Sequence, residues 1–232
     1  MQPLIGHPVR LGLISCIPLF LAGCATMPEI HRAVLSGDPD RIRPAVQQKE
    51  SVNTIHRGRT PLHIAVERGD TAAARLLLTA GAKPDAPLRP DTGQAAAGTA
   101  LILAVSRGDS AMTRLLLEGG AKVDAPGWNG MTPLMEAARM GRPALARYLI
   151  DRGAVVNRTD EDGRTALIWA ALTGRAETAR ILVGKGADTE LKDIRGRGPT
   201  QYARSRNHRG VLIALRAASN TTERYKIRKS RR

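Results

Sequence analysis

One segment recurs along this chain at a nearly constant spacing, and that recurrence constrains the fold more than any other feature. Four similar stretches occur within the 232 residues, at 58–70, 98–109, 130–142 and 163–175. Their threonines, Thr60, Thr99, Thr132 and Thr165, lie 39, 33 and 33 residues apart. A period of about 20–50 residues is typical of arrays in which each unit packs on its neighbours. The chain is therefore predicted to be a stack of repeated units.

Each unit contains the signals of two short helices. Thr60 and Thr132 suit the N-cap of a first helix, and Pro61 and Pro133 suit its first position, where the missing N–H is not needed. A second apolar run ending in Gly-Ala follows each stretch, at 76–82, 115–121, 148–154 and 181–187. Glycines such as Gly69 and Gly81 follow the two helices, where a left-handed residue ends a helix.

The 33-residue period, together with Thr-Pro-Leu, Ala-Ala, Leu-Leu and Gly-Ala, resembles the ankyrin repeat. The resemblance covers residues 29–215, with a degenerate first copy at 29–38 and a last copy at 196–207. It implies an all-α ankyrin-repeat solenoid of about five to six repeats, in which helix-turn-helix units are joined by hairpin-like loops. It also implies that His63, in the one complete Thr-Pro-Leu-His motif, braces neighbouring turns by hydrogen bonding.

The step from Thr60 to Thr99 is six residues longer than the others. The extra residues lie around 86–98, in a stretch rich in proline, glycine and alanine. Insertions in arrays fall in the loops between repeats, so a long loop is predicted here. The sequence leaves open whether this loop contacts a partner or is simply tolerated.

Residues 1–23 predict an export signal. Arg10 supplies a positive charge, and the apolar stretch 11–21 is much shorter than the roughly 20 residues of a membrane-spanning helix. The four residues that end at Cys24, Leu-Ala-Gly-Cys, resemble the lipobox of bacterial lipoproteins. This resemblance implies removal of the signal, acylation of Cys24, and a short anchor and linker at 24–28.

Two consequences follow for the location of the protein. Ala25 stands where an aspartate retains such lipoproteins at the inner membrane, so the resemblance implies the outer membrane, facing the periplasm. The only other cysteine, Cys16, lies in the removed segment. The exported chain is therefore expected to fold without a disulfide.

The charge of the chain indicates anionic partners. The 36 Lys and Arg exceed the 21 Asp and Glu, which gives a formal net charge of +15. Predicted export argues against nucleic acid and favours an acidic exported protein. The basic tail, residues 216–232, is predicted to be drawn to anionic surfaces, with a merely solvated tail as the alternative.

The sequence does not predict an enzyme. It contains no Gly-x-Ser-x-Gly elbow, no phosphate-binding loop and no His-Glu-x-x-His pattern. No cofactor and no metal are expected. The acidic triplet 160–162 is a weak candidate for a cation, because the ankyrin resemblance places Asp160 in a loop hairpin.

What remains is a binding surface. The ankyrin resemblance implies a concave face built from the loops and the exposed ends of the first helices. The candidate partner-binding residues on it are His56, Arg57, Arg59, Arg68, Arg107, Trp128, Asn129, Met131, Arg139, Met140, Arg164, Lys192, Arg195 and Arg197. Trp and Arg are enriched at binding hot spots, and Trp128 on a polar loop is the sharpest candidate. Its ring could instead fold back on a neighbouring repeat, and Trp169 is expected to pack in the core.

These features predict a membrane-anchored lipoprotein that acts as a protein-binding scaffold, or as an inhibitor or immunity-type binder of an acidic exported protein. The alternative is an envelope-structural protein that binds anionic lipid, lipopolysaccharide or cell-wall polymer through its basic surface. The sequence leaves the partner and the oligomeric state open.

Overall fold

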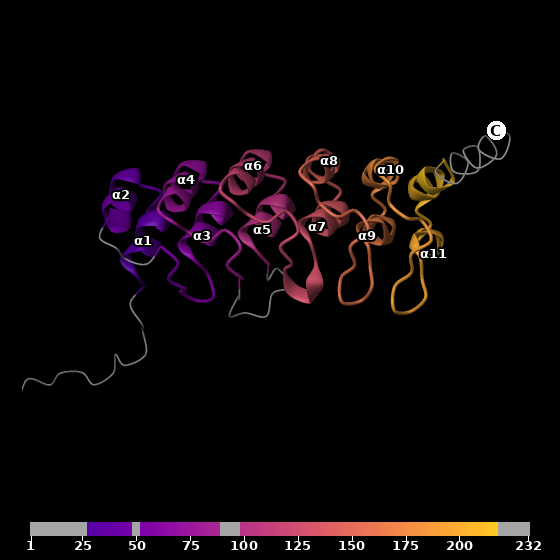
Figure 1. Ribbon diagram of the computed structural model, residues 1–232, viewed down its shortest axis with the longest axis horizontal. Helices are drawn as coiled ribbons and strands as arrows, with labels where there is room; N and C mark the ends of the chain where they lie inside the picture. Colours follow the sequence, from indigo (N-terminus) through magenta and orange to yellow (C-terminus); the bar gives the residue numbers. More distant parts are fainter. Residues whose placement is uncertain (1–26, 48–51, 89–97, 218–232) are drawn as a thin grey trace, which may run out of the picture.

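The computed structural model describes residues 27–47, 52–88 and 98–217. The predicted signal, Cys24 and nearly all of the basic tail lie outside the described residues. Within these ranges the regular secondary structure is helical, and Figure 1 shows the helices in pairs along one row. The predicted all-α solenoid is therefore confirmed.

The helices form two layers. The inner helices are α1 (Glu29–Ser36), α3 (Pro61–Arg68), α5 (Ala100–Arg107), α7 (Pro133–Met140), α9 (Ala166–Thr173) and α11 (Pro199–Ser205). The outer helices are α2 (Pro39–Gln47), α4 (Thr71–Thr79), α6 (Ser110–Glu118), α8 (Pro143–Asp151) and α10 (Ala176–Gly184). A further helical segment covers 209–217, and a short 3₁₀ turn, η1 (Trp128–Gly130), lies before α7.

The predicted start and stop signals work as expected. Thr60, Thr99, Thr132 and Thr165 are the N-caps of α3, α5, α7 and α9, and each side chain accepts a backbone N–H from three residues on. At the other end of these helices the chain turns with a positive φ, for example 70° at Gly69. A side chain would strain that conformation, so glycine is the residue that suits it.

The core is an aliphatic layer between the two rows of helices. Leu77, Leu116, Leu149 and Leu182 occupy equivalent outer-helix positions and are fully buried. Alanines on the inner helices, such as Ala104 and Ala137, are also fully buried and let neighbouring helices approach closely. Each inner helix packs on the next one along the chain. The stability of such a stack therefore depends on the interfaces between neighbours.

Asparagine and aspartate side chains join each repeat to the next at the base of the loops. In each case a side-chain oxygen accepts a backbone N–H from the following repeat at 2.7–3.1 Å. The four acceptor–donor pairs are Asn53–Lys83, Asp85–Lys122, Asp124–Val155 and Asn157–Asp188. These bonds fix how far one repeat is shifted relative to its neighbour.

The long loop between α4 and α5 is closed at its base. The backbone N–H of Leu88 donates to the carbonyl of Gly98 at 2.7 Å, and Leu88 is buried. The rest of the predicted insertion, 89–97, lies outside the described residues. Whether it contacts a partner stays a prediction.

None of the described helices has the length and apolar character needed to cross a membrane.

Candidate functional site

The loops that lead into the inner helices all project to one side of the stack (Figure 1). We call four of them fingers: 52–60, 121–132, 154–165 and 187–198. The finger face is the surface formed by these fingers and the last residues of the inner helices. All fourteen predicted partner-binding residues lie on these elements. Their role in binding stays a prediction.

Trp128 stands at the tip of its finger. The 3₁₀ turn η1 and the left-handed Asn129, with φ 60°, turn the chain sharply, and the Gly127 N–H donates to the Met131 carbonyl at 2.8 Å. The indole is 69% exposed, so it does not fold back on a neighbouring repeat. Ile194, two repeats further on, is 70% exposed and is a second apolar fingertip, outside the set of fourteen candidates.

Backbone hydrogen bonds link the last three fingers. The Glu161 N–H donates to the Asn129 carbonyl, and the Ile194 N–H donates to the Asp162 carbonyl, each at 3.0 Å. The tips that carry Trp128 and Ile194 are thereby held in one continuous strip.

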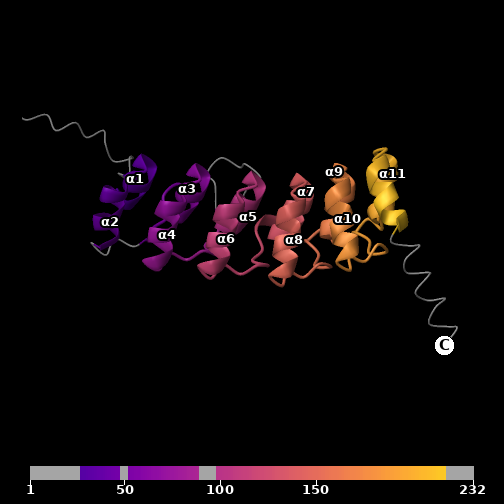
Figure 2. The ribbon, with the colours of Figure 1, turned by 90° about the horizontal axis from the view of Figure 1, so that it is seen from above.

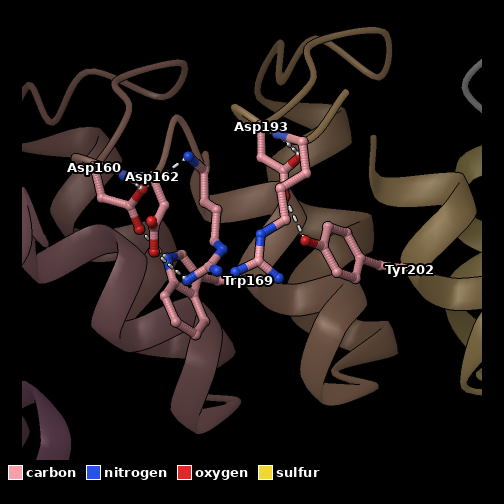
Figure 3. A network of polar contacts seen from close by, with 7 residues as sticks. Asp160, Asp162, Trp169, Asp193 and Tyr202 are labelled. Atoms are coloured by element: carbon pink, nitrogen blue, oxygen red, sulfur yellow. Dashed lines mark hydrogen bonds and ion pairs between the residues drawn. The ribbon is translucent and has the colours of Figure 1, made fainter. Parts of the chain in front are cut away.

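Asp160 organises the third finger (Figure 3). One carboxylate oxygen accepts the backbone N–H groups of Asp162 and Arg164, at 3.0 and 2.8 Å. The other accepts the indole N–H of Trp169 at 2.9 Å. The Arg164 guanidinium lies 5.1 Å from the centre of the Trp169 ring, within cation–π range. Trp169 is therefore half-buried: it packs against the core, as predicted, and its indole N–H is held by the finger.

The same arrangement occurs 33 residues later, with Asp193, Arg197 and Tyr202 (Figure 3). The Tyr202 hydroxyl donates to Asp193, and Arg197 lies 4.7 Å from the centre of the Tyr202 ring. Burial raises the pKa of the Asp193 carboxyl. The hydrogen bonds from Tyr202, Arg197 and Arg195, with the charge of Arg197, outweigh that effect and leave the pKa below its ordinary value.

Both units carry the same sequence signal, Asp-x3-Arg-x4-Trp/Tyr, 33 residues apart. We call each unit an Asp–Arg–aromatic clasp. In its clasp, Asp160 holds the turn of the finger through its hydrogen bonds to Asp162 and Arg164. The described residues contain no group of three or more His, Cys, Asp or Glu side chains suited to a metal ion.

The predicted basic residues divide into two sets. Arg59, Arg139 and Arg164 pair with Glu67, Glu136 and Asp162 at 2.8–3.1 Å, and Arg197 belongs to a clasp. The hydrogen bonds of Arg139 to the buried Glu136 raise the pKa of its guanidinium above the ordinary value. The second set is exposed and makes no ion pair with any described residue: Arg57, Arg68, Arg107, Lys192 and Arg195. The second set is better suited to a partner.

The histidines in and beside the first finger make contacts within the protein. His63 is buried, and its Nδ1 accepts the backbone N–H of Thr60 at 3.2 Å. Burial lowers the pKa of His63 to about 4; the charge of Arg59 acts in the same direction, and a backbone hydrogen bond with Ala86 of the next repeat opposes it. The candidate His56 packs edge-on against His31, with ring centroids 5.7 Å apart.

The family comparisons agree with this architecture. The family model described as "Ankyrin repeats (3 copies)" matches residues 30–126 and 88–160, and the model "Ankyrin repeat" matches 162–194. No match to a curated protein was found.

Among solved structures, the chain is similar to the ankyrin repeat domain of Bcl-3, described as a unique member of the IkappaB protein family. The TM-score is 0.73 and the identity 26%, over 84% of this chain and 86% of that one. In total 619 chains match, so likeness of fold does not by itself select a partner.

Proposed function

Because this chain belongs to the ankyrin-repeat family, we propose that it recognises a specific protein through its finger face. Ankyrin repeats form scaffolds for protein–protein interaction, and the open question is what this scaffold binds and where. The observation that carries the proposal is Trp128, a large aromatic side chain that is 69% exposed on a finger ordered by backbone bonds. Tryptophan is among the residue types most enriched at the hot spots of protein–protein interfaces.

The charges around this anchor support an acidic partner. The finger-face cations without an ion pair to a described residue, such as Arg107 and Arg195, lie on both sides of Trp128 along the stack. Cations at the rim of an apolar anchor attract an acidic protein and orient its approach. We propose that the partner combines an apolar pocket with acidic surroundings.

The lipobox at Cys24 supports an exported, lipid-anchored location, with the fingers available to a partner in the same compartment. In this setting the protein either positions an envelope protein or neutralises an exported one. Replacement of Cys24 by Ser should release the protein from membranes. A Cys24→Ser protein that stays bound after a high-salt wash would contradict the anchor while leaving the finger-face proposal intact.

Affinity capture with the full-length protein tests the binding face. Wild type is compared with Trp128→Ala, Ile194→Ala and the matched control Ile213→Ala, since Ile194 and Ile213 are 70% and 66% exposed. We expect a single protein to be recovered by wild type and by Ile213→Ala, and to be lost with Trp128→Ala. Equal recovery by all four proteins would refute the finger face as the site.

A further inference from the structure

Each of the outer helices α2, α4, α6, α8 and α10 carries an arginine at its fifth position, whereas the helical segment 209–217 has Ile213 at the equivalent position. The arginines are Arg43 in α2, Arg75 in α4, Arg114 in α6, Arg147 in α8 and Arg180 in α10. All five are exposed. We call this set the arginine row. The inner helices hold alanine at their fifth position and have no counterpart to the row.

The row is straight because the outer helices are stacked side by side. Figures 1 and 2 show α2, α4, α6, α8 and α10 in one line along the long axis, on the side opposite the fingers. Packed helices lie about 8–10 Å apart, and α2 packs on α4, α4 on α6, and α8 on α10. The five arginines therefore follow the line of the outer helices over roughly 40 Å.

The described residues leave most of this charge without an ion pair. The side chains of Arg43, Arg75 and Arg147 make no ion pair with a described residue. Arg114 lies 5.8 Å from the centre of the Tyr148 ring, a contact that leaves its charge unpaired. Arg180 pairs with Glu177 on its own helix, through side chains that are more than half exposed.

Positive groups also surround a shallow cavity on this line. The cavity lies between α8 and α10 and has a volume of about 260 Å³. Arg147, Arg180 and Lys185 line it, against the single acid Glu177. An anionic group placed there would meet three cations, although Glu177 and Asp151 compete for two of them.

We propose that the arginine row binds a linear polymer with regularly spaced phosphate or carboxylate groups, laid along the outer helices. Guanidinium groups bind both anions in a bidentate manner. Each exposed contact is weak, so a useful affinity arises only when one chain spans several arginines. This site is independent of the proposed protein-binding role, because it lies on the opposite side of the stack from the fingers.

A bilayer is a poorer fit to the row. The large exposed apolar side chains among the described residues are Leu35, Ile55, Trp128, Val155, Ile194 and Ile213. None belongs to α2, α4, α6, α8 or α10, so these helices offer nothing to insert between lipids. The five arginines follow one line along the stack, which matches an extended chain better than a plane of headgroups.

The test uses full-length protein and four probes: long-chain inorganic polyphosphate, tripolyphosphate, polygalacturonate and vesicles of anionic phospholipid. One variant replaces the five row arginines by glutamine, which is a good helix former. The matched control replaces the five unpaired finger-face cations, Arg57, Arg68, Arg107, Lys192 and Arg195, by glutamine. Both variants lose five positive charges, and both keep the basic tail. Equal urea midpoints would show that neither change disturbs the fold.

We expect the row variant to bind long-chain polyphosphate or polygalacturonate on the order of 50- to 100-fold more weakly than wild type, and the finger variant to lose less than about 5-fold. Comparing the two polymers identifies whether phosphate or carboxylate is preferred. Equal losses in the two variants would show a general charge effect and overturn the proposal. Tripolyphosphate binding as tight as the long chain would indicate an isolated anion site, and row-dependent binding of vesicles alone would indicate a membrane.

Discussion

The first and second halves of the stack secure their outer helices in different ways. In the first half, Asp70 and Asp109 cap α4 and α6, and each carboxylate accepts a backbone N–H of its own helix at 2.9 Å. In the second half, the equivalent positions hold Arg142, Arg175 and His208. These residues reach back to the preceding repeat instead.

The contacts of the second half end at backbone carbonyls of the preceding inner helix. Arg142 donates to the Ser106 carbonyl at 3.3 Å, and Arg175 donates to the Arg139 carbonyl at 3.2 Å. A positive charge at the C-terminal end of a helix also interacts favourably with its dipole. At the starts of the outer helices, the first half thus places its polar bonds within a repeat and the second half places them between repeats, so we expect the second half to be the more cooperative.

The largest predicted effect tests whether the halves differ in their cores. Leu116 and Leu149 are equivalent and fully buried, so each change to alanine should lower the free energy of unfolding by about 2–5 kcal/mol. We expect the two values to agree within about 1 kcal/mol, because the aliphatic layer is continuous. Urea unfolding of both variants measures them. An unchanged midpoint for either one would contradict this description of the core.

Between pH 7.5 and 4.5, acid should weaken the first half of the stack through His63. His63 has a pKa of about 4 when folded and near 6.5 when unfolded, so the unfolded chain takes up the proton first as the pH falls. This stabilisation is complete above pH 6.5 and is lost progressively between about pH 6.5 and 4. Between pH 7.5 and 4.5 the loss should be about 2–3 kcal/mol.

Urea unfolding of wild type and His63→Gln at the two pH values tests the effect of His63. The carboxylates titrate alike in both proteins, so their difference isolates the histidine. The equivalent positions in α5, α7 and α9 hold Ile102, Met135 and Ile168, and hydrogen exchange at low pH should therefore accelerate in α3 before α9. Equal acid sensitivity of wild type and His63→Gln would show that the histidine is not the cause.

The clasps distinguish the last repeats from the first. Tyr202→Phe removes the donor to the buried Asp193, and it should destabilise the protein by about 1–2 kcal/mol while keeping the ring under Arg197. The equivalent residue in α3 is Ile64, whose side chain cannot donate a hydrogen bond. Ile64→Val therefore serves as the apolar comparison. Thermal unfolding checks both. A Tyr202→Phe protein as stable as wild type would mean that the hydroxyl bond contributes nothing.

The smallest predicted losses of stability concern the residues at the starts of the outer helices. Asp109→Ala should cost about 1 kcal/mol, and Arg175→Gln should cost about 0.5 kcal/mol. Their locations should differ more than their sizes. Loss of Asp109 should accelerate hydrogen exchange within α6, whereas loss of Arg175 should accelerate it at both the end of α7 and the start of α10. Exchange confined to α10 in Arg175→Gln would contradict the inter-repeat role.

The sequence predicted the parts of this molecule that depend on neighbours along the chain. Threonine caps, glycine helix ends and the leucine layer each rest on a few adjacent residues repeated at a fixed period. The clasps were missed although both were present in the sequence, because Asp160 meets Trp169 only after the finger folds back over its helix. The arginine row was missed for a related reason: one exposed arginine per repeat has meaning only when the outer helices are seen in line.

Which finger-face cations form ion pairs could also not be predicted from the sequence. Arg139 and Arg107 each add one positive charge to the net charge of the sequence. In the structure, Arg139 is bound to the buried Glu136, whereas Arg107 is exposed without an ion pair to a described residue. The exposure of Trp128 follows from a left-handed Asn129, and asparagine only favours that conformation without requiring it.

The backbone bonds between the last three fingers have a consequence for recognition. Association is opposed by the entropy lost when loops become ordered, and here the strip from Asn129 to Ile194 is already ordered before a partner arrives. A partner therefore gains affinity from the strip without having to arrange it. The same rigidity sets a limit, because three linked fingertips cannot adapt separately. Selectivity in this protein rests on a match of shape along the whole strip, and a partner that fits one fingertip alone gains little.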